Sequence, residues 1–219
     1  MYKRNKRQNK KIKWLITFLV VILLLSVRLV EEIGQDKHPD ERFVVARVID
    51  GDTVELKGGD RLRLLSVDTP EKGEPFYEEA RTLLASKSLG EVAKIDFANK
   101  RRDRYGRLLG YLYINDELIN KTIISNGLGY LYLFKDTEIK HPAVKEMLEA
   151  QKEAIFAQTG IWSLKRYEED YYINKSGSFR LHRPSCSSVR MLKEGKYRKF
   201  KKREDGFITG LSPCRNCKP

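Results

Sequence analysis

The alternation of apolar and polar residues predicts a β-rich domain in the middle of the chain. β-Branched and other apolar residues occur there in short runs, a pattern typical of half-buried strands. We expect five strands, at Phe43–Ile49, Thr53–Leu56, Arg61–Val67, Glu91–Phe97 and Leu108–Ile114. The first three are separated by two glycine-containing turns, Asp50-Gly51 and Gly58-Gly59-Asp60.

Three helices are predicted between and after these strands, at Glu78–Leu89, Leu118–Asn126 and Pro142–Gln158. Each is followed by a glycine, which is a common helix stop: Gly90, Gly127 and Gly160. Five strands with helices inserted and appended predict the α+β class, with an OB-type five-stranded β-barrel and α-helices packed around it. We assign residues 43–173 to this barrel domain.

Residues 1–30 have the pattern of a membrane anchor or an export signal. Residues 1–13 carry a net charge of +7, and residues 14–27 contain no charged side chain. The basic flank predicts a cytoplasmic N-terminus, with everything after residue 31 outside the cytoplasm. We favour an uncleaved single-pass membrane helix because no small-x-small cleavage site follows, and secretion after cleavage is the alternative. A charged linker, residues 31–42, leads to the barrel domain.

The net charge of +13 is concentrated at the two ends of the chain. Residues 31–173 have a net charge of −5, whereas residues 174–219 have +10 and contain all three cysteines. We therefore predict a separate small basic module at residues 174–219. A hydrophobic content of 41% is typical of a globular protein and excludes wholesale disorder.

Three short runs in the barrel domain contain the groups needed to cut a phosphodiester: Asp50-Gly51-Asp52-Thr53, Arg63 to Glu71, and Asp103 to Arg107. Hydrolysis requires an activated water and neutralisation of charge on the phosphoryl oxygens, and a hard divalent cation can provide part of this. We predict that Asp52 and Asp68 share such a cation and that Glu71 holds and deprotonates the water. Arg63 and Arg107 are predicted to bind phosphate oxygens as bidentate donors.

The chain from about residue 43 to Trp162 resembles the staphylococcal (micrococcal) nuclease family. The resemblance rests on four runs: Val48-Ile-Asp-Gly-Asp-Thr53, Arg63-Leu-Leu-Ser-Val-Asp-Thr-Pro-Glu71, Asp103-Arg-Tyr-Gly-Arg107 and Gly160-Ile-Trp162. It implies an OB-fold endonuclease that cleaves DNA and RNA with Ca²⁺ and leaves 3′-phosphate ends. It further implies that calcium is bound by Asp52, Asp68 and the Thr69 carbonyl. The implied catalytic residues are Arg63, Glu71 and Arg107.

The resemblance also implies that nucleotide rings stack on tyrosines late in the barrel domain. Three aromatic residues occupy that region here: Tyr130, Tyr132 and Phe134.

The C-terminal segment contains an H-x₃-C and a C-x₂-C pair, formed by His182, Cys186, Cys214 and Cys217. This spacing predicts a tetrahedral structural zinc site. A disulfide is the alternative outside a cell, although three cysteines cannot all pair within one chain. His38 and His141 have no such context, and we expect both to be exposed to solvent.

The same segment resembles the metal-binding domain of the Ada DNA-repair protein. That domain uses four cysteines, and His182 stands where its methyl-accepting cysteine would be, so methyl transfer is not expected. The resemblance leaves a zinc-stabilised basic fold suited to holding a nucleic-acid backbone. The alternative is a solvated charged tail.

Taken together, these patterns predict a calcium-dependent endonuclease that acts on DNA and RNA outside the cytoplasm and carries a structural zinc. The alternative is a non-catalytic cell-surface protein that captures nucleic acid.

Overall fold

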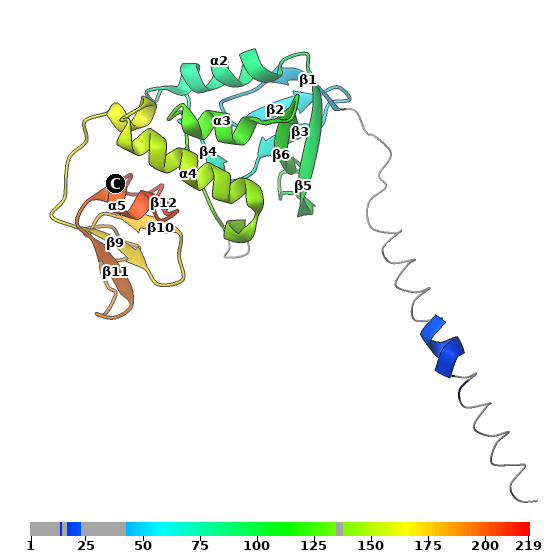
Figure 1. Ribbon diagram of the computed structural model, residues 1–219. Coiled ribbons are helices and arrows are strands. Elements are labelled where there is room, and N and C mark those ends of the chain that lie inside the picture. Colours follow the sequence, from blue (N-terminus) through cyan, green and yellow to red (C-terminus); the bar gives the residue numbers. More distant parts are fainter. Residues whose placement is uncertain (1–13, 15–16, 23–42, 135–137) are drawn as a thin grey trace, which may run out of the picture. The chain divides into compact units, whose positions relative to one another are not determined.

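The computed structural model describes residues 14, 17–22, 43–134 and 138–219. Trp14 and residues 17–22 are helical and exposed, and no helix in the described part of the chain is long and apolar enough to cross a membrane. Residues 1–13, 15–16 and 23–42 lie outside the described residues, so the anchor and linker stay predictions. Residues 42–219 form one compact unit (Figure 1).

The centre of this unit is a closed five-stranded barrel, as the sequence predicts. Its strands are β1 (Phe43–Val48), β2 (Thr53–Leu56), β3 (Arg61–Leu64), β5 (Val92–Arg102) and β6 (Leu108–Ile114). They are hydrogen-bonded in the order β3-β2-β1-β5-β6, and a parallel pairing between β3 and β6 closes the barrel. A two-residue strand, β7 (Glu117–Leu118), pairs antiparallel with the last two residues of β6.

The third predicted strand is too long, because the chain turns before Asp68. Strand β3 ends at Leu64, and Ser66 has a φ of 58°, which an extended strand cannot contain. The next two residues form a separate strand, β4 (Val67–Asp68), which pairs with β8 (Tyr130–Leu131) instead of continuing the barrel. The hydroxyl groups of Ser66 and Tyr111, 3.2 Å apart, hydrogen-bond at this turn.

The predicted helices are present, with ends shifted by one or two residues: α2 (Tyr77–Ser88), α3 (Ile119–Ser125) and α4 (Pro142–Phe156). Short 3-10 turns, η1 (Glu138–Lys140) and η2 (Gly160–Ser163), flank α4. The prediction that His141 is exposed is wrong. Its ring is partly buried, stacks on Tyr111 at 4.5 Å and accepts a hydrogen bond from the first turn of α4. His38 lies outside the described residues.

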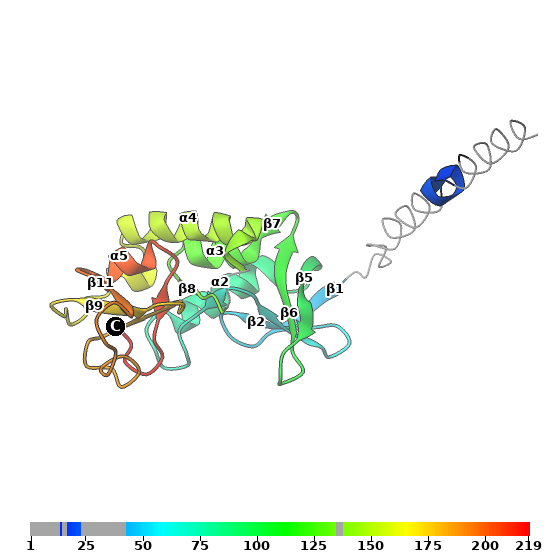
Figure 2. The same ribbon diagram turned by 90° about the horizontal axis from the view of Figure 1, so that it is seen from below.

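The C-terminal segment, residues 174–219, belongs to a second small sheet. Its strands run in the order β11-β9-β10-β12, with β9 (Tyr172–Lys175), β10 (Arg180–His182), β11 (Tyr197–Phe200) and β12 (Ser212–Pro213). A short helix, α5 (Arg203–Phe207), lies beside α4 in both views (Figures 1 and 2).

This sheet is packed against the barrel domain through a shared apolar core. Ile155 and Trp162 from the barrel domain pack with Leu181 and Phe207 from the C-terminal segment. Trp162 and Phe207 have ring centroids 5.4 Å apart. Burying both surfaces together is favourable in proportion to the apolar area removed from water. The C-terminal segment therefore lies in a defined position on the barrel domain.

Candidate active site

One guanidinium brings the two predicted cation ligands together. Nη2 of Arg63 lies 2.8 Å from Oδ2 of Asp52 and 3.5 Å from Oδ1 of Asp68. All three side chains are largely buried, with 16%, 10% and 16% of their surface exposed. The two carboxylates thus face the same point, although 15 residues and two turns separate them in the chain.

Asp52 is held in place by the turn that precedes β2 and by Thr69. The amide and hydroxyl of Thr69 both donate to its Oδ2 at 3.3 Å, and the Thr53 hydroxyl donates to its Oδ1 at 3.0 Å. Burial raises the pKa of Asp52 to about 7, because the charged form loses hydration that Arg63 and the Thr69 amide only partly replace. A further cation beside this carboxyl would stabilise its charged form.

Gly51 allows this turn to approach its neighbours closely. A Cβ at this position would lie 2.7 Å from Cβ of Ala80 and 2.7 Å from Oγ1 of Thr69. Both distances are shorter than van der Waals contact allows, so only glycine fits between α2 and Thr69. The glycine that sequence analysis assigns to a hairpin turn thus also packs behind the site.

Asp68 is positioned by the short β4–β8 ladder and by a buried amide. Asn120 is fully buried in α3; its side chain accepts from the Leu112 amide at 2.9 Å and donates to the Leu65 carbonyl at 2.8 Å. This fixes the turn between β3 and β4 to the barrel. The strand register and this amide together aim Asp68 at Arg63.

Glu71 and Arg107 lie at the edge of this group, without a direct contact to it. The exposed Glu71 lines a cavity beside Asp68, and its amide donates to Oε2 of Glu74 at 2.9 Å. The guanidinium of Arg107 is paired with Asp103 at 2.8 Å. Arg107 lies just before β6, two residues ahead of Leu109, the register partner of Arg63, and it lines a separate cavity with Gly59, Asp60 and Arg61.

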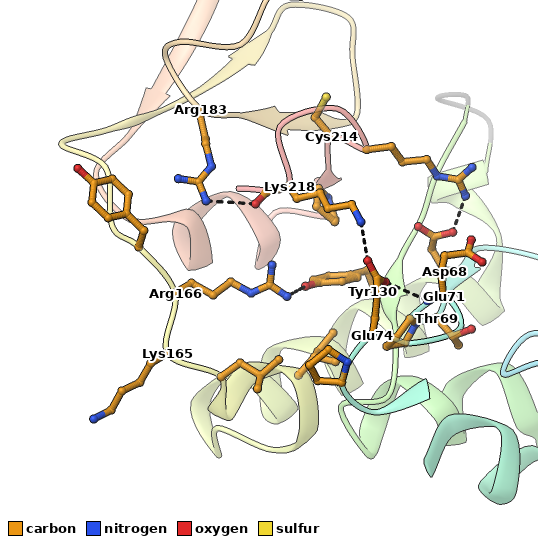
Figure 3. A pocket seen from close by; sticks show the side chains of 17 residues that line it. Asp68, Thr69, Glu71, Glu74, Tyr130, Lys165, Arg166, Arg183, Cys214 and Lys218 are labelled. Atoms are coloured by element: carbon orange, nitrogen blue, oxygen red, sulfur yellow. Dashed lines mark hydrogen bonds and ion pairs between the residues drawn. The ribbon is translucent and has the colours of Figure 1, made fainter. Parts of the chain in front are cut away.

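The cavity beside Asp68 has a volume of about 660 Å³ and lies between the barrel domain and the C-terminal segment (Figure 3). Arg215 enters it from the C-terminal segment and donates to Oδ1 of Asp68 at 2.6 Å. Lys218 pairs with Glu74 at 2.5 Å. Sequence analysis missed both residues, because the high charge of the segment was their only signal.

The four predicted zinc ligands are brought together. One ligand atom from each of His182, Cys186, Cys214 and Cys217 lies within 4.8 Å of the others. The Nδ1 atom of His182 is buried and has no hydrogen-bond partner among the described residues, and none of the three cysteines forms a disulfide. Three sulfur atoms and one imidazole nitrogen are a donor set that Zn²⁺ accepts.

Burial lowers the pKa of His182, which favours the neutral imidazole that binds metal. Burial and the two neighbouring thiols raise the pKa of Cys217 to about 12. Because these thiols repel each other as thiolates, a cation at their centre would favour the charged form. The chemistry of this cluster therefore fits a metal ion.

The three aromatic residues of the predicted stacking region have different surroundings. The ring of Tyr130 packs against both Trp162 and Phe207, and its hydroxyl lies 3.4 Å from Arg166. Tyr132 is buried beneath Arg180, whose guanidinium lies 3.6 Å from the ring centroid. Phe134 has 68% of its surface exposed. Tyr130 lines the cavity beside Asp68.

Comparison with known proteins places these residues in a family context. The model of a family described as staphylococcal nuclease homologue matches residues 61–164. Protein ParB of Escherichia coli is 35% identical over 134 residues, covering 56% of this chain and 72% of the relative. The thermonuclease of Staphylococcus hyicus is 28% identical over 164 residues, covering 68% and 95%. The thermonuclease of Staphylococcus intermedius is 34% identical over 131 residues, covering 56% and 76%.

Proposed function

Because this chain belongs to the family of staphylococcal nuclease homologues and is a nuclease, we propose that it is a calcium-dependent endonuclease that cleaves DNA and RNA outside the cytoplasm. The observation that carries the proposal is the convergence of Asp52, Arg63 and Asp68 on one point. Two carboxylates and a guanidinium at one place suit both a hard cation and a phosphate.

Oxygen atoms of Asp52 and Asp68, with the Thr69 carbonyl, would hold the calcium ion. When bound, Ca²⁺ supplies positive charge that stabilises the phosphoryl oxygens as negative charge develops on them. The donor set fits because both carboxylates already face cationic groups: Arg63 contacts both, and Arg215 contacts Asp68.

Glu71 is the proposed base. Its side chain lines the cavity beside Asp68 and is exposed, so it can accept a proton from a water that approaches the phosphorus atom. Arg63 would bind one phosphoryl oxygen from within the site, and Arg107 a second from the turn before β6, after leaving Asp103. Attack with departure of the 5′ oxygen would leave a 3′-phosphate, the product that the family resemblance implies.

The zinc cluster is proposed to be structural. It would be formed by one Zn²⁺ bound to His182, Cys186, Cys214 and Cys217, and these four side chains leave no position for a reactive water. This arrangement supports a role in holding the C-terminal segment in shape.

The proposed location is the outer face of the cytoplasmic membrane, anchored by residues 1–30. The motivation is the charge of +7 followed by an uncharged apolar stretch. Protease treatment of intact cells tests this: digestion of the barrel domain without cell lysis is expected. Protection until lysis would contradict the proposed topology.

Plasmid digestion with and without calcium tests the proposed activity. Purified protein dialysed free of calcium should leave supercoiled plasmid intact, and adding back Ca²⁺ should restore cutting. The circular dichroism spectrum should be nearly the same in both conditions, because the barrel core does not include the metal site. Undiminished cleavage without calcium would disprove calcium dependence, and no cleavage under any condition would favour the non-catalytic alternative.

Two substitutions test the assignment of the catalytic side chains. Glu71→Gln and Arg107→Ala should each lower turnover on the order of 10²-fold or more, because each removes a group that acts in the transition state. Arg104→Ala is the control for the second, since Arg104 is exposed and, within the described residues, interacts with the ring and hydroxyl of Tyr105 alone. Full activity of both test variants would show that the site is assigned wrongly.

A further inference from the structure

We propose that the C-terminal segment forms the second wall of the substrate groove, and that Arg215 and Lys218 bind phosphates of the single nucleic-acid strand next to the cleaved bond. The inference rests on the proposed nuclease function and extends it beyond the residues that the family model matches, which end at residue 164. It gives the basic segment a specific task at the active site.

The shape of the cavity supports two walls. One wall comes from the barrel domain and contains Asp68, Thr69 and Glu71; the opposite wall comes from the C-terminal segment and contains Arg183, Arg215 and Lys218 (Figure 3). A volume of about 660 Å³ is within the range of sites that hold small molecules. It suits one or two nucleotides of a single strand.

The charged side chains that line the cavity suit a polyanion held at a metal site. The barrel wall carries the carboxylates of Asp68, Glu71 and Glu74, and the remaining lining carries five basic side chains: Lys165, Arg166, Arg183, Arg215 and Lys218. Of these carboxylates, Asp68 is a proposed cation ligand and Glu71 is the proposed base. The basic side chains lie where the phosphates of a strand that leaves this site would pass.

Arg215 and Lys218 can change partners without disturbing the fold. They bridge to Asp68 and Glu74, yet 61% and 62% of their side-chain surfaces are exposed. Asp68 is largely buried, but the cationic partner of each pair is exposed to solvent, where ion pairs contribute little to stability, so each cation can exchange its carboxylate for a phosphate at little cost. A cation shared by Asp52 and Asp68 would further weaken the hold of Asp68 on Arg215.

The backbone that carries these two residues is well anchored. Both belong to the run Cys214 to Lys218, which includes two of the predicted zinc ligands. The Lys218 amide donates to the Cys214 carbonyl at 2.9 Å, and Nε of Arg183 donates to the Cys217 carbonyl at 3.0 Å. Such anchoring reduces the entropy lost on binding, which distinguishes this loop from a mobile basic tail.

An exposed aromatic side chain in the groove offers a surface on which a nucleobase can stack. Tyr167 lines the cavity with 75% of its surface exposed, and the Arg183 guanidinium lies 5.9 Å from its ring centroid. Cationic grooves with aromatic rings bind single strands by pairing phosphates and stacking bases. We therefore assign the groove to an unpaired strand.

Binding of a fluorescent 12-nucleotide single-stranded DNA tests this proposal. The parent is the full chain with Glu71→Gln, which prevents cleavage during the measurement. Arg215→Ala/Lys218→Ala should weaken binding by roughly tenfold at about 0.1 M salt. Because each phosphate contact contributes about 0.7 to the salt dependence of single-strand binding, the slope of log Kd against log salt should fall by about 1.4.

The matched control is Arg190→Ala/Lys193→Ala. It removes the same charge from exposed residues of the C-terminal segment that do not line the cavity. Its affinity should change by less than about twofold, because neither side chain lines the cavity and charges exposed to solvent are screened by salt. An equal loss in both double variants would show that only net charge matters, and an unchanged affinity of Arg215→Ala/Lys218→Ala would overturn the proposal.

Two further measurements separate this inference from the proposed activity and from misfolding. Arg215→Lys/Lys218→Arg preserves the charges and should keep affinity within about threefold, whereas a loss as large as with alanine would indicate a structural role.

With Glu71 intact, Arg215→Ala/Lys218→Ala should act mainly by raising KM for a long strand. Faster turnover would instead identify the pair as inhibitory and refute the proposal. Absence of cleavage by the unmodified protein would refute the nuclease proposal alone, because the binding comparison does not depend on cleavage.

Discussion

Arg63 is the residue on which the geometry of the site depends most directly. It contacts both predicted calcium ligands from within β3, and its Nη1 also donates to the Leu64 carbonyl at 2.9 Å. A planar guanidinium can make these contacts at the same time, whereas an ammonium group is a single point charge.

Arg63→Lys should therefore lower kcat/KM on the order of 10²-fold and the free energy of unfolding by about 1–3 kcal/mol, because the buried Asp52 loses its ion pair with the guanidinium. Plasmid digestion and urea denaturation measure these two quantities. The control is Arg61→Lys on the same strand, whose exposed side chain has an ion pair with Glu55 at 3.8 Å. Equal effects of the two variants would contradict the special role of Arg63.

Gly51 makes a different contribution, because it affects the site only through its lack of a side chain. Gly51→Ala should destabilise the protein by about 1–3 kcal/mol, since the new methyl group overlaps Ala80 and Thr69. The same overlap would displace Asp52, so turnover should fall by roughly 10- to 100-fold. Thermal melting and initial rates of digestion provide the measurements. A stable and fully active variant would mean that the turn can relax without moving the site.

At the scale of elements, α4 joins the barrel domain to the C-terminal segment through one buried side chain. Gln151 is fully buried; its Oε1 accepts from the Leu131 amide in β8 at 2.7 Å, and its Nε2 donates to the Phe207 carbonyl at the end of α5 at 2.8 Å. β8 is also the strand that pairs with β4 and so holds Asp68. One glutamine thus links both walls of the groove.

Gln151→Ala should lower the free energy of unfolding by about 2–5 kcal/mol, because two buried backbone groups lose their partners. It should also weaken binding of the 12-nucleotide strand, since the two walls lose a shared connection. The control is Lys152→Ala at the next residue of the same helix. Lys152 has a surface ion pair with Glu149, so its replacement should change stability by less than about 0.5 kcal/mol. Denaturant unfolding separates the two, and equal midpoints would show that Gln151 does not link the walls.

At the scale of the whole molecule, residues 42–219 behave as one unit in the structure, and the cluster of His182, Cys186, Cys214 and Cys217 lies beside the groove. The shared core of Ile155, Trp162, Leu181 and Phe207 joins the two parts. Destabilising the C-terminal segment should therefore also impair the nuclease site.

Cys217→Ser should lower the zinc content from one equivalent per chain and lower the melting temperature on the order of 10 °C, because metal binding and folding are linked. It should also weaken strand binding about as much as Arg215→Ala/Lys218→Ala, since both cations lie beside the cluster. Elemental analysis, melting curves and anisotropy measure the three effects. Zinc-free protein with unchanged melting and binding would exclude a structural metal.

The sequence by itself determined the barrel and the chemical groups of the site. Strand alternation predicts β1, β2 and β6 closely, because half-buried strands require period-two patterns whatever surrounds them. The motifs of Asp52, Arg63 and Asp68 identify the family because the chemistry needs those side chains. The zinc spacing likewise predicts four ligands that the structure brings together.

Only the tertiary structure decided which residues, distant in the sequence, surround and position that site. Ser66 ends β3 early because Val67–Asp68 finds a partner in β8, 64 residues further along the chain, and no local pattern contains that pairing. Asn120 and Gln151 are polar residues on the apolar faces of their helices. Their role could not be predicted from the sequence, because their hydrogen-bond partners are backbone groups of distant elements. Arg215 reaches Asp68 across 147 residues. Such contacts follow from the packing of whole elements, so they cannot be predicted from the local sequence.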